Sequence, residues 1–293
     1  TQEDIAQVIN KKTSIPIYEI LKDTTKSIKI LEKTLKDNII GQDKAIEDLI
    51  SYTKKIKLGF TNNKIKSYLF IGPTGVGKTA LAKLYSNVLR GENKLIRLDM
   101  SEYSDATSIN KIIGSAPGYV GYQDNNTITS KLKENPTAII LLDEIDKAHP
   151  TITNLLYQIL DESTITDAQN NTINLNNNII IMTSNIGFEE KTLGFTNTQN
   201  PLITSKLKEK FPPSLINRID TTVIFNRLTK DDITKIINNK LQKLTQKYPD
   251  FTYTKSLVQD IINKSNYQEF GARKLDKIIE YKLENIIIDK IIN

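Results

Sequence analysis

The chain has 293 residues and a mass of 33.2 kDa, enough for one large or two ordinary domains with a substantial core. Apolar residues make up 38%, charged residues 25% and the net charge is +6, but no apolar run reaches the length of a membrane span, so no membrane partner is expected. The lack of Cys excludes disulfides and thiolate metal sites, and a single His, His149, argues against a zinc centre or a Ser-His-Asp triad.

The basic residues are scattered and form no long Lys/Arg run, so we expect no nucleic-acid partner despite the high pI. The chain is rich in Ile, Asn and Lys, which AT-rich codons encode, and it keeps few Arg. Lys can replace Arg on a solvated surface but not where a planar guanidinium must meet phosphate. Each remaining Arg therefore deserves separate consideration. Arg218 and Arg273 fall in motifs described below, whereas Arg90, Arg97 and Arg227 match no catalytic motif and are expected to form surface ion pairs.

Residues 1–36 contain polar helical segments around an extended Ser14-Ile15-Pro16 step. From 37 to 227, short apolar runs alternate with helical patterns, which predicts an α/β domain whose parallel sheet is covered by helices on both faces. The expected strands are Tyr68–Ile71, Leu95–Leu98, Ala138–Leu142, Ile179–Met182 and Thr222–Phe225.

After Arg227 the pattern becomes helical. Thr229 is placed to cap a helix, with Asp232 three residues later. Apolar residues then recur at helical spacing, and a second amphipathic pattern runs from Leu275 to Ile287. Residues 228–293 are therefore predicted to form a small, mainly helical domain.

A complete GxxxxGK[ST] sequence lies between the first expected strand and a helix, which is the context that a phosphate-binding loop requires. Its glycines allow backbone N–H groups to surround an anion at a helix N-terminus. Lys78 is expected to contact the β- and γ-phosphates, and the Thr79 hydroxyl is expected to bind Mg²⁺. The loop, with ATP as its expected ligand, consists of Gly72, Pro73, Thr74, Gly75, Val76, Gly77, Lys78 and Thr79.

Two adjacent carboxylates, Asp143 and Glu144, end the apolar run Ala138–Leu142. At the C-terminal edge of a parallel sheet they would lie beside the phosphate loop. We expect Asp143 to belong to the Mg²⁺ shell and Glu144 to polarise the water that attacks the γ-phosphate. This pair favours hydrolysis over phosphoryl transfer to a second substrate. His149 is expected to pack or to begin a helix.

Together these segments resemble the AAA+ ATPases, and more narrowly the second ATPase module of the Clp unfoldases, the ClpA, ClpB and ClpC group. The resemblance covers nearly the whole chain and implies that residues 1–36 are the tail of a preceding module or the linker between the two modules. The missing initial Met also leads us to expect a longer protein. The segments that carry it are Ile40–Asp43, the phosphate loop, Asp99–Tyr103, Gly118–Tyr122, Asp143–Pro150, Met182–Asn185, Asn217–Asp220 and Gly271–Arg273.

The resemblance also implies roles for single residues. Asn185 corresponds to the polar sensor that positions the attacking water, and Arg218 to the arginine finger that reaches the nucleotide of a neighbouring subunit. Arg273 corresponds to the sensor that contacts the phosphates from the small domain. Ile39 and Ile40 correspond to the segment that packs on adenine, although plain core packing is the alternative for both.

Two loops carry the expected partners. Tyr119 and Val120 correspond to the axial pore loop that grips unfolded protein substrates in a homo-oligomeric ring, expected to be a hexamer; a purely structural Tyr119 is the alternative. Leu193, Gly194 and Phe195 correspond to the tripeptide that docks a ClpP-type peptidase, unless these apolar side chains fold back onto the protein.

The sequence thus predicts an ATP-hydrolysing unfoldase module of the ClpC or ClpA type, in a plastid stroma such as that of an apicoplast or in a bacterial cytoplasm. A ClpB-like disaggregase that needs no peptidase is the nearest alternative. A nucleic-acid AAA+ motor is suggested only by the pI. A phosphate-loop kinase is disfavoured by Asp143-Glu144 and by Arg218.

Overall fold

The computed structural model describes residues 2–13, 24–115, 127–188, 199–247 and 252–282. Its centre is a parallel five-stranded sheet in the order β2-β3-β6-β1-β7. All five predicted strands are present, so the predicted fold is confirmed. Their bounds are β1 (Lys66–Ile71), β2 (Leu95–Asp99), β3 (Ile139–Asp143), β6 (Ile179–Ser184) and β7 (Thr221–Ile224).

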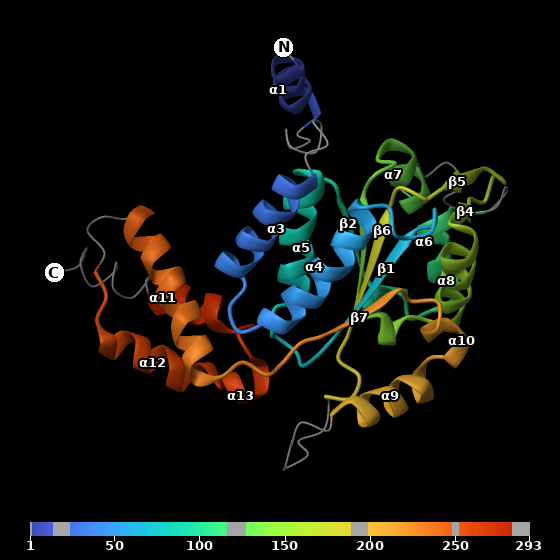
Figure 1. Ribbon diagram of the computed structural model, residues 1–293. Coiled ribbons are helices and arrows are strands. Elements are labelled where there is room, and N and C mark those ends of the chain that lie inside the picture. The colour runs from blue at the N-terminus through green and yellow to red at the C-terminus, as the bar shows by residue number, and fades with distance from the viewer. Residues whose placement is uncertain (1, 14–23, 116–126, 189–198, 248–251, 283–293) are drawn as a thin grey trace.

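Helices cover both faces of this sheet (Figure 1). Alternate strand residues point to opposite faces, so Tyr68 and Phe70 enter one core while Leu69 and Ile71 enter the other. The first core is closed by α3 (Thr24–Asn38), α4 (Asp43–Lys57) and α5 (Lys78–Arg90); the second by α6 (Asn110–Ile113), α7 (Ile128–Glu134) and α8 (Pro150–Glu162).

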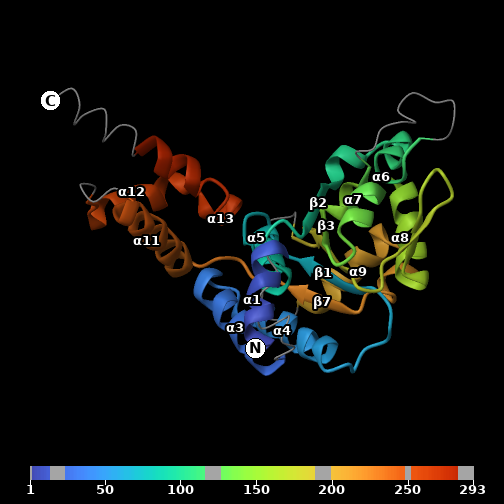
Figure 2. The ribbon, with the colours of Figure 1, turned by 90° about the horizontal axis from the view of Figure 1, so that it is seen from above.

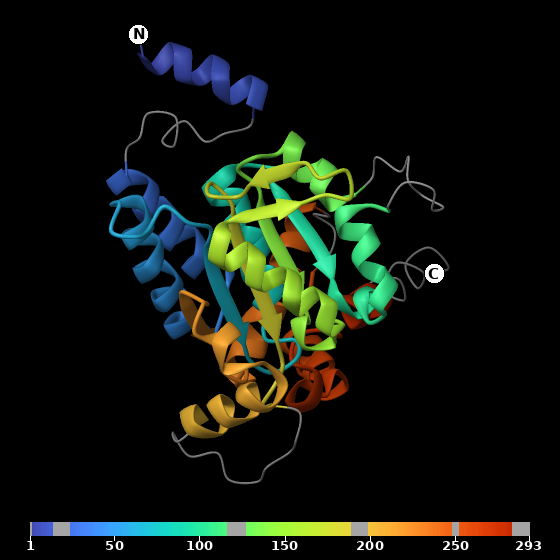
Figure 3. The same cartoon turned by 90° about the vertical axis from the view of Figure 1, so that its right-hand side faces the viewer.

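The predicted boundary between residues 36 and 37 falls inside α3. Leu31 and Leu35 of this helix are buried in the core that also contains Tyr68. Residues 24–36 therefore pack with the helices that cover the sheet. The preceding helix α1 (Gln2–Thr13) lies apart from the sheet in Figures 1 and 3 and exposes Ile5 and Val8.

The C-terminal helices lie to one side of the sheet, as the view from above shows (Figure 2). They are α11 (Lys230–Lys247), α12 (Lys255–Ser265), α13 (Tyr267–Phe270) and a helical stretch over 275–282. The expected cap is present, because Thr229 Oγ1 accepts from the N–H of Asp232 at 3.1 Å while Asp232 accepts from the N–H of Thr229 at 2.9 Å. Ile233, Ile237 and Ile261 continue the core of the α3 side.

A short antiparallel hairpin, β4 (Thr164–Thr166) and β5 (Thr172–Asn174), was not expected from the sequence. It follows α8 and lies beyond the end of that helix in Figure 3. The remaining elements are α9 (Gln199–Lys210) and α10 (Pro213–Ile216), which lead into β7. Within the described ranges, no helix is long and apolar enough to cross a lipid bilayer.

Candidate nucleotide site

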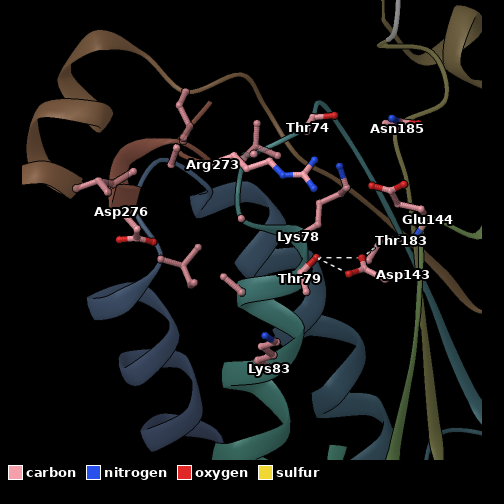
Figure 4. A pocket seen from close by; sticks show the side chains of 18 of the residues that line it. Thr74, Lys78, Thr79, Lys83, Asp143, Glu144, Thr183, Asn185, Arg273 and Asp276 are labelled. Atoms are coloured by element: carbon pink, nitrogen blue, oxygen red, sulfur yellow. Dashed lines mark hydrogen bonds between the residues drawn. The ribbon is translucent and has the colours of Figure 1, made fainter. Parts of the chain in front are cut away.

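A cavity of about 480 Å³ opens where β1, β3 and β6 end, at the N-terminus of α5 (Figure 4). This is the edge at which parallel sheets bind ligands. The cavity brings together most of the predicted site residues from five separate segments. These are Ile39, Ile40, Thr74, Gly75, Val76, Gly77, Lys78, Thr79, Asp143, Glu144, Asn185 and Arg273. Gly72 and Pro73 begin the phosphate loop directly after β1.

The phosphate loop depends on glycine at two positions for different reasons. Gly77 has φ +106° and open space where a Cβ would stand, so only its left-handed backbone requires glycine. Gly75 has φ +74°, and a Cβ there would lie 2.1 Å from the carbonyl oxygen of Phe270. The loop thus turns tightly into α5 and approaches the C-terminal helices closely.

Lys78 is folded back onto its own loop. Its Nζ donates to the carbonyl oxygens of Gly72 at 2.6 Å and Pro73 at 2.7 Å. Burial lowers the pKa of Lys78 to about 8, against the opposing effect of nearby carboxylates, chiefly Asp143. A partly desolvated ammonium at this position is well suited to contact a phosphate.

Asp143 is buried at the end of β3 and holds several partners at once. Its carboxylate accepts from the hydroxyls of Thr79 at 3.0 Å and Thr183 at 2.6 Å, and from Arg97 Nη2 at 2.7 Å. Burial alone would raise the pKa of Asp143, but these hydrogen bonds outweigh it and lower the pKa below its usual value. Asp143 is therefore held ionised.

Arg97 is a site residue that the sequence analysis did not identify, since no motif marks it. It lies on β2, one strand over, where Asp99 pairs in register with Asp143. Its guanidinium reaches Asp143 Oδ2 through both Nε, at 3.1 Å, and Nη2. The only local signal is the charged pair Arg97 and Asp99 at alternate positions of an otherwise apolar run.

Glu144 follows Asp143 in a left-handed conformation with φ 57° and ψ 51°. Glu144 lines the cavity, and Figure 4 shows its carboxylate below Asn185 and to the right of Lys78. Asn185 comes directly after β6, so the two side chains approach the cavity from neighbouring strands. The arrangement places one carboxylate and one amide where a water molecule could be held beside a bound phosphate.

The opposite end of the cavity is more apolar and is shared with the C-terminal helices. Ile39 and Ile40 line it from the segment after α3, and Leu228 and Ile236 line it from the start of the C-terminal part. These four side chains could contact an adenine ring. Arg273 also lines the cavity, and Figure 4 shows its guanidinium directed toward the Lys78 side.

Arg218 lies outside this cavity. Its Nε donates to Asp161 at 2.6 Å, its Nη1 donates to the carbonyl oxygen of Ser214 at 2.6 Å, and its guanidinium lies 5.1 Å from the ring centre of Tyr157. Arg90 and Arg227 donate to the backbone carbonyls of Asn177 and Gln268, and neither side chain lines the cavity.

His149 caps α8, because its Nδ1 accepts from the N–H of Thr151 at 3.2 Å; the expectation of a helix-start residue is confirmed. Tyr119 and Val120, and Leu193, Gly194 and Phe195, lie outside the described residues.

Comparison with known proteins agrees with this geometry. Residues 63–222 match the family described as AAA domain (Cdc48 subfamily), and residues 228–293 match the family described as C-terminal, D2-small domain, of ClpB protein. A solved structure described as Hsp104 with ATPyS and FITC casein in a closed state superposes with a TM-score of 0.82 at 30% identity. The superposition covers 99% of this chain and 52% of the Hsp104 chain.

Three curated relatives match along essentially the whole chain. ClpL of Staphylococcus aureus, an ATP-dependent Clp protease ATP-binding subunit, is 41% identical; the match covers 99% of this chain and 42% of the ClpL chain. The chaperone ClpB of Oceanobacillus iheyensis is 34% identical, and a ClpA homolog of Pyropia yezoensis is 36% identical. Each match covers 100% of this chain and 38% of the relative's length. This chain thus spans about two fifths of these relatives. It belongs to the AAA+ Clp ATPases and has the make-up of their second ATPase module, an AAA domain followed by a small helical domain.

Proposed function

We propose that this module hydrolyses ATP to drive the unfolding and translocation of protein substrates. The observation that carries the proposal is the single cavity in which Lys78 and Thr79 face Asp143, Glu144 and Asn185. The ligand end of a parallel sheet, a phosphate loop and a carboxylate placed for water activation are the parts that ATP hydrolysis needs.

The residues fit Mg²⁺ as the metal. Thr79 Oγ1 and the Asp143 carboxylate are hard oxygen ligands 3.0 Å apart. In the described part of the chain no group of three or more His, Cys, Asp or Glu could hold a metal alone, which suits an ion that takes its other ligands from phosphates and water. Bound there, Mg²⁺ would neutralise charge on the β- and γ-phosphates.

In this proposal Lys78 leaves the carbonyls of Gly72 and Pro73 and donates to the phosphates. Glu144 accepts a proton from the attacking water, while Asn185 orients that water by hydrogen bonding. Arg273 contacts the phosphates from the C-terminal helices. Ile39 and Ile40 pack on the adenine.

Replacing Glu144 tests the chemistry. Glu144→Gln should bind ATP with near wild-type affinity but hydrolyse it at least about a hundredfold more slowly, because the amide cannot accept the proton. Lys78→Ala should instead lose binding itself. Nucleotide affinity and single-turnover hydrolysis separate the two outcomes. A Glu144→Gln protein that binds ATP poorly yet turns over each bound molecule normally would contradict the assignment.

The proposed partners follow from the membership of this chain in the AAA+ Clp ATPases. A homo-oligomeric ring, with six subunits as the expected number, would place the Tyr119 and Val120 loop around a central pore to grip unfolded substrates. Tyr119→Ala should then retain ATP hydrolysis but lose unfolding of a tagged test protein, because grip depends on the aromatic side chain.

A ClpP-type peptidase is the proposed downstream partner, through Leu193, Gly194 and Phe195. Relatives named as protease ATP-binding subunits and relatives named as ClpB chaperones match this chain alike, so peptidase-independent disaggregation is the second candidate. A pull-down with the cognate peptidase in ATPγS and in ADP decides between them. Phe195→Ala should abolish that binding and leave ATPase activity intact; lost thermal stability with retained binding would favour the disaggregase.

The assignment as a ClpC or ClpA type protein of a plastid stroma or a bacterial cytoplasm is also part of the proposal. Its support is the Ile-, Asn- and Lys-rich composition, which AT-rich genomes produce.

A further inference from the structure

One buried hydroxyl contacts both acidic residues of the site. Thr183, on β6, has no exposed surface. Its Oγ1 donates to Asp143 Oδ1 at 2.6 Å and accepts from the backbone N–H of Glu144 at 3.0 Å. Figure 4 shows Thr183 beside Asp143 and below Glu144, on the side away from Lys78. Thr183 therefore uses its single hydroxyl proton and a lone pair on neighbouring residues.

The bond to Glu144 lies where the sheet stops supporting the chain. The ladder between β3 and β6 ends at the pair Leu142 and Met182. Glu144, two residues later, turns into the left-handed region at φ 57°, which a residue with a long side chain occupies only at an energetic cost. The Thr183 hydroxyl takes the N–H of Glu144 at this turn and so stabilises the turn from the neighbouring strand.

We propose that Thr183 is a positioning residue for ATP hydrolysis. It does not need to touch nucleotide or water. By holding the backbone of Glu144 it fixes the direction in which that carboxylate leaves the strand, and by donating to Asp143 Oδ1 it fixes the plane of the carboxylate that faces Thr79. The inference rests on the proposed function, in which Glu144 activates the attacking water.

The physical reason is that the backbone conformation of Glu144 sets the position of its carboxylate. Without its acceptor, the N–H of Glu144 would be left unsatisfied near a buried strand end, and the turn would relax toward an ordinary backbone conformation. A small backbone rotation moves the distant carboxylate by far more than it moves Cα. Misplacement of a catalytic group by about 1 Å can slow a reaction by about a hundredfold.

The test uses two substitutions in the intact protein. Thr183→Val removes the hydroxyl but keeps the branched shape; it should lower kcat by about ten- to a hundredfold while ATP affinity stays within about threefold. Thr183→Ser restores the hydroxyl and should recover most of the lost turnover. ATP affinity is measured by titration with a fluorescent ATP analogue, and kcat by phosphate release at saturating ATP.

Thr53→Val is the matched control. The Thr53 hydroxyl is also buried, and it bonds to the carbonyl oxygen of Leu49 at 2.7 Å and to the hydroxyl of Tyr85 at 3.0 Å, within the core rather than the cavity. It should lower the melting temperature without changing kcat, which separates a lost buried hydrogen bond from lost positioning.

Three results would overturn the inference. Thr183→Val could turn over ATP at the wild-type rate, or could lose ATP affinity as much as turnover. Alternatively, Thr53→Val could reduce kcat as strongly as Thr183→Val does. If the wild-type protein hydrolyses ATP, any of these results would contradict the role of Thr183 but not the proposed function. A wild-type protein that binds but does not hydrolyse ATP overturns the proposed function, and this inference with it.

Discussion

At the scale of single residues, Asp143 is the centre of the site. Three other segments meet at its carboxylate, because Thr79, Thr183 and Arg97 all donate to it. Arg97 is the only fully charged donor among these three. A guanidinium on this carboxylate compensates a buried negative charge next to the place where phosphates are expected, and a divalent cation would have to share that carboxylate with it.

Replacing Arg97 should therefore make nucleotide binding more dependent on Mg²⁺. In Arg97→Ala the uncompensated Asp143 would repel phosphates, so ADP affinity in EDTA should fall roughly tenfold, while affinity with Mg²⁺ should change little. The half-exposed guanidinium is screened by solvent, which limits the effect. Fluorescent ADP titrations with and without Mg²⁺ measure it.

Arg90→Ala is the control for this substitution, because Arg90 lies at the other end of α5 and bonds to the carbonyl oxygen of Asn177. It should leave both affinities unchanged. If the ratio of ADP affinity with Mg²⁺ to ADP affinity without it is the same in Arg97→Ala and wild type, the pair between Arg97 and Asp143 does not influence nucleotide binding.

At the scale of elements, the β4–β5 hairpin is organised by one carboxylate. Asp167 accepts from the N–H groups of Gln169 at 2.9 Å and Asn171 at 2.8 Å, and from Lys133 Nζ of α7 at 2.7 Å. Burial alone would raise the pKa of Asp167, but the hydrogen bonds, chiefly that from Lys133, lower the pKa to about 2. A single side chain thus closes the turn and ties the hairpin to α7.

This lowered pKa predicts a pH-dependent contribution to stability. Folding lowers the pKa of this carboxylate, so its charge stabilises the protein at any pH above its pKa in the unfolded chain, near 3.8. That contribution is lost as pH falls toward about 2. Asp167→Asn should reduce the free energy of unfolding by about 1–2 kcal/mol at neutral pH, and by less as pH falls below about 4.

Urea unfolding of wild type and Asp167→Asn across that pH range measures the difference. Asp37→Asn, at an exposed position near the end of α3, is the control and should behave like wild type. A stability difference that stays constant down to pH 2 would mean that the Asp167 charge is not the cause.

At the scale of the whole molecule, the C-terminal helices rest directly on the phosphate loop. The N–H of Ala272 donates to the carbonyl oxygen of Gly75 at 2.9 Å. Gly271 has φ +55°, and a Cβ there would lie 2.5 Å from the same oxygen. This contact joins the C-terminal helices to the loop, and Arg273 follows Ala272 immediately in sequence.

Gly271→Ala should separate the two parts. The added methyl group would push the C-terminal helices from the loop, so ATP affinity should fall about tenfold while the sheet remains folded. Gly59→Ala is the matched control, since Gly59 has φ +76° but no atom within 4 Å of a Cβ. Its expected effect is a small loss of stability with normal ATP binding. Normal binding in Gly271→Ala as well would show that the contact is dispensable.

Arg218 belongs to the same scale, because its proposed partner lies on another subunit. Mixing Arg218→Ala subunits with Glu144→Gln subunits should restore part of the ATPase activity, since some interfaces would combine an intact Arg218 with an intact Glu144. Activity is measured against mixing ratio in rings verified to be mixed. A failure to recover activity would place the action of Arg218 within its own subunit.

The sequence alone determined the fold class and the principal site. Runs such as Ile179–Met182 are apolar throughout because both faces of a parallel strand are buried, so their composition identifies them without any partner. Likewise the phosphate loop is contiguous, and its chemistry follows from the spacing of Gly72, Gly77 and Lys78. The cap formed by Thr229 and Asp232 is local as well. The β4–β5 hairpin was missed because its strands are too short to show a period.

Which residues share the carboxylate of Asp143 follows from tertiary contacts and not from any local sequence pattern. Arg97 and Thr183 lie on the strands on either side of β3, and the contact depends on the order and register of those strands, which no local pattern contains. The same holds for Gly75 and Ala272, nearly two hundred residues apart, whose hydrogen bond forms only when the C-terminal helices pack back on the phosphate loop. Sequence patterns report what each segment buries, whereas contacts between segments follow from how the buried faces fit together.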